Sequence, residues 1–346
     1  MRHYDPEMAT NAPVRRSSLV RNWAYVLRTT NPPPGRVDSV SRWLVLTRAA
    51  VLPMTVTAAL IAGLLAWWLQ PDEVSVGWWL LSSAGIVLAH VANNLMNDLF
   101  DLEVGTDSAG YPRALYAPHP VLSGMITRAR LLRAALVVNV IDLGILVALF
   151  WARGWPVVAF ALGGFLLSAA YTAPPLRLKK HGLGEPTVLI VWGPLMVGGT
   201  YYAATGHLPW EIVAASLPYA LLCTTVLMGK HIDKIPWDRP DGTHTLPVVM
   251  GERAARVLTQ AMMAAFYVLV VALVAVRALP VPSLLVLLAL PRLVPVWKAF
   301  SRPRPDAPPD DWPIWPLWFA GLAFAHTRRA GALFVVGLAL GLAVGW

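Results

Sequence analysis

Long apolar stretches separated by short polar segments dominate the pattern of this chain. About 20 apolar residues in a helix cross a hydrocarbon core about 30 Å thick, so stretches of that length predict spans. Nine occur, at residues 43–69, 76–97, 131–151, 156–172, 187–204, 211–229, 254–278, 281–300 and 331–346. None alternates like a barrel strand, and backbone groups in lipid must be paired within their own segment. The pattern therefore predicts an all-α, polytopic membrane bundle of about nine transmembrane helices.

Composition and charge agree with this prediction. The chain is 57% hydrophobic and 14% charged, whereas soluble domains carry nearer a quarter charged residues. The net charge of +9 does not indicate a nucleic-acid partner, because Lys and Arg gather at alternate loops. Only Arg153 and Arg277 fall at the loops after the third and seventh stretches, and the loops after the first and fifth have none. The positive-inside rule then predicts a cell-membrane protein with its N-terminus in the cytoplasm.

Two further segments lie toward the ends of the chain, outside these apolar stretches. Residues 1–40 are polar, basic and Pro-rich, which predicts a flexible cytoplasmic tail attracted to the lipid bilayer, followed by one membrane domain at residues 41–346. Residues 312–325 are apolar but short and interrupted by proline, and Arg328 and Arg329 follow them. We expect an interfacial or re-entrant segment there. Any chemistry must come from the helices and their loops.

A first acidic segment ends the second stretch. Asn94, Asn97, Asp98 and Asp101 follow the spacing i, i+3, i+4, i+7, which places them on one helix face, and Asp107 comes after. Carboxylates this close repel each other, and a helix C-terminus disfavours negative charge, so a cation is expected. Mg²⁺ suits oxygen ligands shared with substrate phosphates. Zinc is less suited, because the sequence has no Cys or His pair at ligand spacing.

A second acidic segment, with Asp233, Asp238 and Asp241, ends the sixth stretch. Pro236 is expected to end the helix, so that Asp238 and Asp241 lie on the following loop. Both acidic segments end even-numbered stretches and should reach the same membrane face. The basic residues expected on that face are Arg113, Arg177, Lys179, Lys180 and Lys230. Carboxylates, a divalent cation and Lys or Arg together are typical of a site for a di- or triphosphate.

The lone histidines of these segments are His90 and His231. Each is expected to be a neutral side chain that is hydrogen-bonded within the bundle.

These motifs resemble the UbiA superfamily of intramembrane prenyltransferases. The run Asn94-Leu-Met-Asn97-Asp98-Leu-Phe-Asp101, with Asp107 after it, resembles the Asn-Asp-x-x-Asp signature of that family, and its long last gap is like the menaquinone-type (1,4-dihydroxy-2-naphthoate polyprenyltransferase) branch. Residues 171–175, 182–185, 193–202 and 245–248 look like the same branch. One departure stands out: the branch usually carries Asn-Asn-x-Arg-Asp at its second motif, where this chain has Gly-Lys-His-Ile-Asp-Lys at 229–234.

The resemblance implies Mg²⁺-dependent transfer of an isoprenoid chain from a prenyl diphosphate to an aromatic acceptor in quinone biosynthesis. The first metal ion would be held by Asn94, Asn97, Asp98, Asp101 and Asp107, and the second by Asp233, Asp238 and Asp241. The catalytic carboxylates would be Asp98, Asp101, Asp233 and Asp238. The diphosphate would be bound by Arg113, Lys179 and Lys230. The π face of Tyr171 or Tyr201 would stabilise the allylic cation.

Other functions are compatible with the same residues. The same donor could be transferred to a phosphoribosyl or glycerol-phosphate acceptor. A cation-coupled transporter would place carboxylates near the midplane on broken helices, and Asp142 is the acidic residue near the centre of a predicted helix. A lipid-binding scaffold is a further alternative.

Overall fold

The computed structural model describes residues 16–35, 37–103, 119–310, 312 and 314–345, without the side chains of residues 16–18 and 101–103. Within these residues, nine helical spans are long and apolar enough to cross a membrane. They are Leu52–Leu69 (α3), Val76–Glu103 (α4), Arg128–Arg153 (α6), Trp155–Thr172 (α7), Gly184–Ile190 (α8) continued by Val191–Gly198 (η4, π-helical) and Gly199–Thr205 (α9), Trp210–Asp238 (α10), Glu252–Ala275 (α12), Val281–Ala289 (η5) continued by Leu290–Phe300 (α13), and Trp318–Val344 (α14). The predicted all-α membrane bundle of about nine helices is confirmed.

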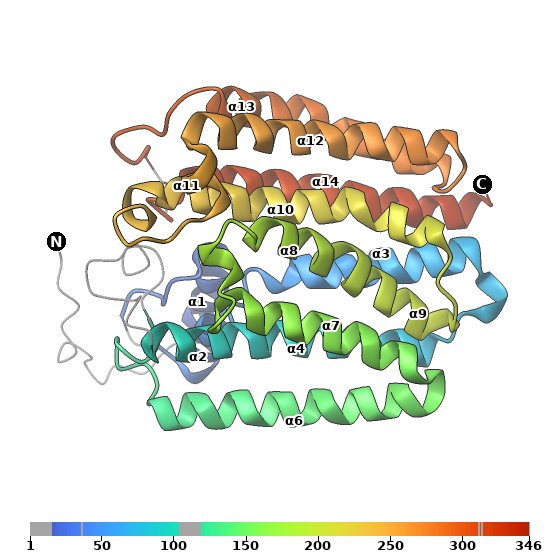
Figure 1. Cartoon of the computed structure of the whole chain (residues 1–346), viewed down its shortest axis with the longest axis horizontal. Coiled ribbons are helices and arrows are strands. Elements are labelled where there is room, and N and C mark those ends of the chain that lie inside the picture. The colour runs from blue at the N-terminus through green and yellow to red at the C-terminus, as the bar shows by residue number, and fades with distance from the viewer. Residues whose placement is uncertain (1–15, 36, 104–118, 311, 313, 346) are drawn as a thin grey trace.

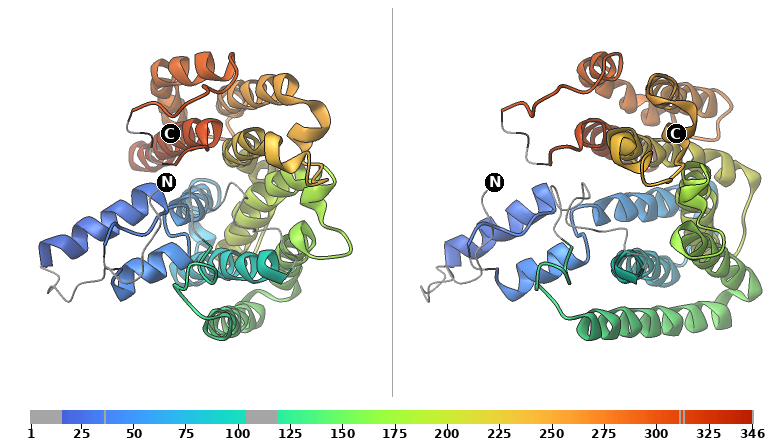
Figure 2. Two further views of the ribbon diagram at one scale, coloured as in Figure 1. Left: turned by 90° about the vertical axis from the view of Figure 1, so that its left-hand side faces the viewer. Right: turned by 60° about the vertical axis from the view of Figure 1, so that its left-hand side comes forward.

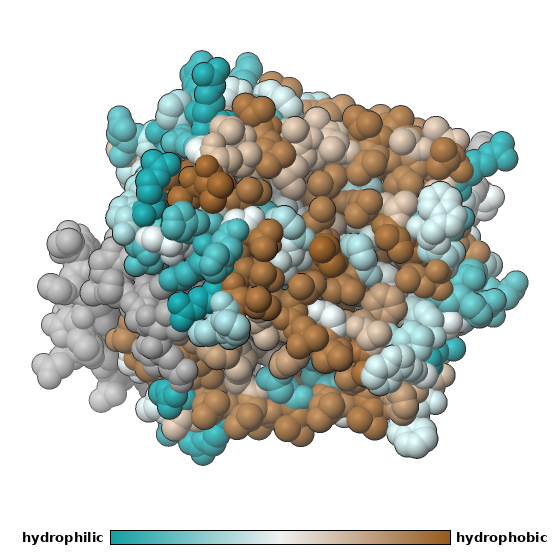
Figure 3. All heavy atoms as spheres, in the orientation of Figure 1, coloured by the Kyte–Doolittle hydropathy of each residue, from teal (hydrophilic) through white to brown (hydrophobic). Residues whose placement is uncertain are grey.

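The spans lie side by side along the long axis of the molecule (Figure 1). The packed core lies between α3, α10, α12 and α14, whereas few residues of α6 and α7 are buried. Figure 2 shows α12 and α13 along one edge and α6 along the other. Apolar side chains cover the middle of the face in Figure 3 and polar ones gather toward its two ends, as expected for a membrane-spanning bundle. We call the end of the bundle where α4 and α10 finish the acidic end.

The first predicted span is broken. It divides into α2 (Ser39–Leu46) and α3, joined by a turn at residues 47–51. The prediction of one helix over 43–69 was wrong because Pro53 starts α3: proline has no N–H to donate to the preceding turn and is favoured at the first helical positions. In the turn, Arg48 has a φ of 52°, which is uncommon for a residue other than glycine.

The end of α10 also differs from the prediction. The helix continues through Pro236 to Asp238, so Asp238 is helical and only Asp241 lies in the turn that follows. Pro236 removes one hydrogen bond, but the helix is still closed by the Arg239 N–H, which donates to the Ile235 carbonyl at 3.1 Å. The expectation that proline ends this helix was therefore wrong by about one turn.

Both termini hold more helix than the sequence indicates. α14 begins at Trp318, so residues 318–325 are the start of the last span rather than an interfacial segment, and Arg328 and Arg329 lie within it. Residues 16–29 form α1 (Arg16–Thr29), inside the segment expected to be a flexible tail. The Trp23 indole donates to Asp38 at 3.1 Å and ties α1 to the start of α2. Residues 1–15 lie outside the described part of the chain.

Candidate active site

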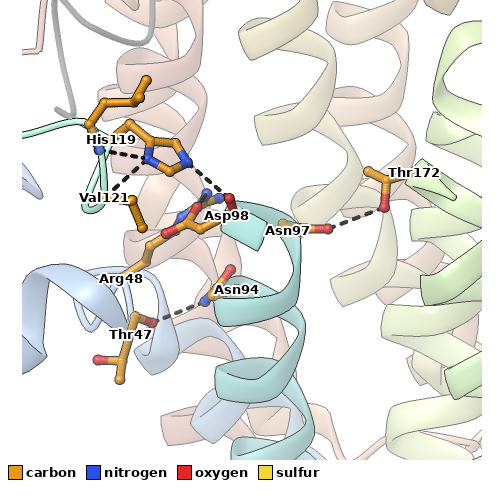
Figure 4. Close-up of polar contacts among 9 residues, drawn as sticks. Thr47, Arg48, Asn94, Asn97, Asp98, His119, Val121 and Thr172 are labelled. Atoms are coloured by element: carbon orange, nitrogen blue, oxygen red, sulfur yellow. Dashed lines mark hydrogen bonds and ion pairs between the residues drawn. The ribbon is translucent and has the colours of Figure 1, made fainter. Parts of the chain in front are cut away.

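Asp98 is the best-defined carboxylate of the first acidic segment. Its side chain is 1% exposed, and its Oδ1 accepts a hydrogen bond from Arg48 Nη2 at 2.5 Å (Figure 4). The main-chain oxygen of Asp98 accepts from His119 Nε2 at 2.9 Å. A buried carboxylate is stable only when it is paired and hydrogen-bonded, and Arg48 provides that partner from the turn between α2 and α3.

The two asparagines of this segment contact opposite neighbours. Asn94 Nδ2 donates to the Thr47 carbonyl at 3.0 Å, so the amide oxygen is the atom turned away from that turn. Asn97 Oδ1 accepts from Thr172 Oγ1 of α7 at 3.4 Å (Figure 4). This face of α4 therefore bridges the turn before α3 and the end of α7. Asp101 is helical but its side chain is outside the described residues, as are Asp107 and Arg113 entirely.

Three further candidates lie at the acidic end. Tyr171 is in the last turn of α7, and a Cβ on Gly184 would lie 3.1 Å from its ring, so this glycine allows α8 to approach closely. Lys179 belongs to the short helix η3 (Leu178–Lys180) between α7 and α8, and Lys230 is half-buried on α10. The His244 N–H donates to the Lys180 carbonyl at 3.2 Å, which pairs the loops after α7 and α10.

The carboxylates of the second acidic segment do not converge. Asp233 accepts hydrogen bonds from the N–H groups of Phe319 and Ala320 at 3.0 and 2.9 Å. Asp238 Oδ1 lies 3.5 Å from Lys234 Nζ, and both side chains are buried. Asp241 is exposed in the following turn. No three His, Cys, Asp or Glu side chains within the described residues stand close enough to hold a metal ion.

Tyr201 lies at the opposite end of the bundle. Its hydroxyl donates to Gln70 Oε1 at 2.8 Å, where α3 ends. Along the span that starts with α8, Tyr201 is about 25 Å from Gly184 at a helical rise of 1.5 Å per residue. The expected contact between this tyrosine and an allylic carbon beside the diphosphate does not fit that position, and the hydrogen bond instead anchors α9 to α3.

An apolar cavity starts beside the first acidic segment. It has a volume of about 600 Å³ and lies between α4, α6, α7 and the span formed by α8, η4 and α9. Asn97 and Thr172 line its polar end, and Trp192 lines its wall. Asp142, half-buried, also lines it, next to Gly85 of α4. A cavity of this shape can take a hydrocarbon chain whose polar head stays at α4.

The two histidines are hydrogen-bonded, as predicted. His90 Nδ1 shares a hydrogen bond of 2.6 Å with Thr55 Oγ1, and His231 Nδ1 shares one of 2.7 Å with Glu185 Oε1 of α8. Neither partner was predicted, and nor was Arg48. The position of Pro53 predicts a helix start and hence a turn before it, which could have indicated that Arg48 lies in a turn near the membrane surface. No periodic pattern in the sequence connects Glu185 with His231.

Comparisons with known proteins agree with this geometry. The model of the UbiA prenyltransferase family matches residues 52–325. The chain is 27% identical over 244 residues to the 2-carboxy-1,4-naphthoquinone phytyltransferase of a Synechocystis strain (70% of this chain, 75% of that protein). It is 29% identical over 235 residues to the 1,4-dihydroxy-2-naphthoate octaprenyltransferase of Escherichia coli (64% and 72%).

Solved structures share the fold. A UbiA homologue from Aeropyrum pernix superposes with a TM-score of 0.58 at 19% identity, covering 85% of this chain and 97% of that one. A UbiA homologue from Archaeoglobus fulgidus, bound to DMAPP and Mg²⁺, gives 0.51 at 16% identity, covering 85% and 99%. The fold predicted from the sequence is confirmed by these likenesses.

Proposed function

Because this chain belongs to the UbiA prenyltransferase family and is a multi-pass membrane prenyltransferase, we propose that it transfers an isoprenoid chain from a prenyl diphosphate to an aromatic acceptor of a menaquinone-like quinone. The naphthoate prenyltransferases among its relatives support this acceptor class. The observation that carries the proposal is the apolar cavity that opens beside Asn97, at the polar end of α4. A transporter or a lipid scaffold would not explain the family membership.

The first acidic segment fits Mg²⁺. Asn94, Asn97 and Asp98 carry amide and carboxylate oxygens on one face of α4, which are the ligand atoms that Mg²⁺ prefers. Asp101 and Asp107 complete the proposed set. The Archaeoglobus fulgidus homologue bound to DMAPP and Mg²⁺ supports the assignment. Mg²⁺ held there would neutralise charge on the departing diphosphate.

The protein's own residues would do the rest. Lys179 and Lys230 would bind diphosphate oxygens together with Arg113, because charge-assisted hydrogen bonds to phosphate are strong. The Tyr171 ring, at the acidic end, would face the allylic cation. The cavity would hold the isoprenoid chain and exclude water from that cation. By the positive-inside argument, this site faces the cytoplasm of the cell.

The test is prenyl transfer by the purified protein. We expect product from a labelled prenyl diphosphate and 1,4-dihydroxy-2-naphthoate with Mg²⁺, and none with EDTA. Asp98→Asn should lower kcat/KM by about 100-fold or more, because it removes a charged ligand. Asp72→Asn is the matched control, since Asp72 lies on η2 (Pro71–Glu73) at the opposite end and should keep full activity. Full activity in Asp98→Asn, or turnover in EDTA, would refute the assignment.

The acceptor needs its own test, since the Gly-Lys-His sequence at 229–231 departs from the naphthoate branch. The same assay with a glycerol-phosphate or phosphoribosyl acceptor in place of the naphthoate separates the two classes. Mass spectrometry of the quinones in cells that lack the protein provides an independent answer. Loss of one quinone supports the aromatic acceptor, and an unchanged quinone profile contradicts it.

A further inference from the structure

Asp142 places a carboxyl group in the wall of the apolar cavity. The residue is half-buried on α6, and it lines the cavity together with Gly85 of α4. At a helical rise of 1.5 Å per residue, Asp142 lies about 21 Å from the start of α6 and about 16 Å from its end. Because α6 runs along the length of the bundle (Figure 1), this carboxyl group lies near the middle of the membrane-spanning part.

The carboxyl group of Asp142 has no polar partner. Within the described residues it makes no ion pair or side-chain hydrogen bond, and neither Lys nor Arg is among those that line the cavity. Asn139, one turn away, uses its amide to donate to the Ala135 carbonyl at 2.8 Å. On α4, a Cβ on Gly85 would lie 3.3 Å from Asp142 Oδ1, so the carboxyl group rests against a residue without a side chain. An ionisable group at this depth is costly, which indicates a functional reason for it.

The distance from Asp142 to the polar end of the cavity follows from α4. Gly85 precedes Asn97 by twelve residues, which is about 18 Å along the helix. The side chain of His90, which lies between them, is already hydrogen-bonded to Thr55. Apolar residues that line this stretch include Ile86, Ala89, Met96, Trp192 and Leu195. The cavity therefore offers about 18 Å to a hydrocarbon chain before the chain reaches the carboxyl group.

That length corresponds to a definite number of isoprene units. Each unit adds four carbons to the main chain and extends it by about 5 Å, since carbon–carbon single bonds are about 1.5 Å long. Three to four units, or about 15–20 carbons, then fit between Asn97 and Asp142. A longer chain would have to cover the carboxyl group with hydrocarbon, and burying a polar group without a hydrogen-bond partner is unfavourable.

We propose that Asp142 is a specificity-determining residue that limits the prenyl donor to chains of about 15–20 carbons, because its carboxyl group stands in the path of a longer tail. This inference rests on the proposed prenyl transfer and adds the length class of the donor to it. Asp142 lies about 18 Å from the diphosphate end, so it does not touch the reacting atoms and is not a catalytic residue.

A chain-length profile tests the proposal. The values of kcat and KM are measured with one aromatic acceptor and prenyl diphosphates from two to eight isoprene units. In the wild type, kcat/KM should fall about 10-fold or more beyond four units, the effect of covering one unpartnered polar group. The fall should appear mainly in KM, because the tail makes the same contacts in the ground state and the transition state.

Three variants locate the effect at the carboxyl group. Asp142→Leu keeps a side chain of similar size without polar atoms, so it should raise kcat/KM for the longest donors about 10-fold and leave the short donors unchanged. Asp142→Asn keeps a polar group and should retain most of the limit. Val140→Leu is the matched control, since Val140 is 67% exposed on α6 and does not line the cavity, and its profile should equal that of the wild type.

Two results would overturn the inference while leaving prenyl transfer intact. One is an equal kcat/KM of the wild type for donors of four and eight units, and the other is an unchanged profile in folded Asp142→Leu. Absence of transfer with every donor would instead refute the proposed function. If Asp142→Leu does not fold, the wild-type profile still decides, because only a fall beyond about four units agrees with a stop at this depth.

Discussion

Replacing Arg48 by methionine removes the guanidinium that pairs with the buried Asp98 carboxylate while keeping much of the aliphatic stem. Breaking a fully buried ion pair costs about 3–5 kcal/mol, because one charge is left without compensation. Asp98 is 1% exposed but Arg48 is 27% exposed, so water screens part of the interaction. We therefore expect Arg48→Met to lower the free energy of unfolding by about 2–3 kcal/mol. The hydrogen bond from His119 to the main-chain oxygen of Asp98 stays in place.

A double-mutant cycle isolates the pair. Arg48→Met, Asp98→Asn and the double variant are unfolded reversibly in mixed micelles without divalent cations, and the coupling energy should be about 2 kcal/mol. The matched control is the pair Glu252 and Arg256, 3.2 Å apart on α12, whose carboxylate is 43% exposed. Its coupling should be smaller than that of Arg48 and Asp98, because the Glu252 carboxylate is far more exposed than that of Asp98. A coupling between Arg48 and Asp98 as small as the control would refute the view that Arg48 neutralises Asp98.

Three further predictions test the packing, the cavity and the far end of the bundle. Gly229→Ala should lower the free energy of unfolding by about 3 kcal/mol, because the added Cβ would meet the backbone of α14, which cannot move aside. Gly144→Ala is the control, because it has open space around it and should raise the free energy of unfolding by about 0.5–1 kcal/mol. Equal unfolding free energies of the two variants would contradict the close approach of α10 and α14. Ala89 lies on the cavity wall, about 12 Å along α4 from Asn97, so the larger ring in Ala89→Phe should shorten the longest prenyl diphosphate that the enzyme can use. Mass spectrometry of the products formed from prenyl diphosphates of increasing chain length measures this limit. Tyr201→Phe should lower the free energy of unfolding by about 1 kcal/mol, because the hydrogen bond to Gln70 is lost, and should leave kcat unchanged. A large fall in kcat would instead place Tyr201 in the active site.

Local patterns in the sequence predicted much of this protein. The apolar stretches gave the number of spans because each must satisfy its own backbone hydrogen bonds in lipid. The spacing of Asn94, Asn97 and Asp98 placed these residues on one face of α4, because helical periodicity depends only on neighbours along the chain. These predictions needed no knowledge of which helix packs against which.

Contacts between distant segments had to come from the tertiary structure. The sequence predicted Asp233 as a metal ligand, whereas in the structure its carboxylate accepts a hydrogen bond from the N–H of Phe319, 86 residues away. Tyr201 belongs to a segment that resembles the menaquinone-type branch, but it lies beside the end of α3, at the opposite end of the bundle from Asp98. Arg48 reaches Asp98 only because a turn interrupts the first apolar stretch. The sequence alone determines which residues share a helix face, whereas the packing of helices decides what that face meets, since long-range contacts leave no periodic trace along the chain.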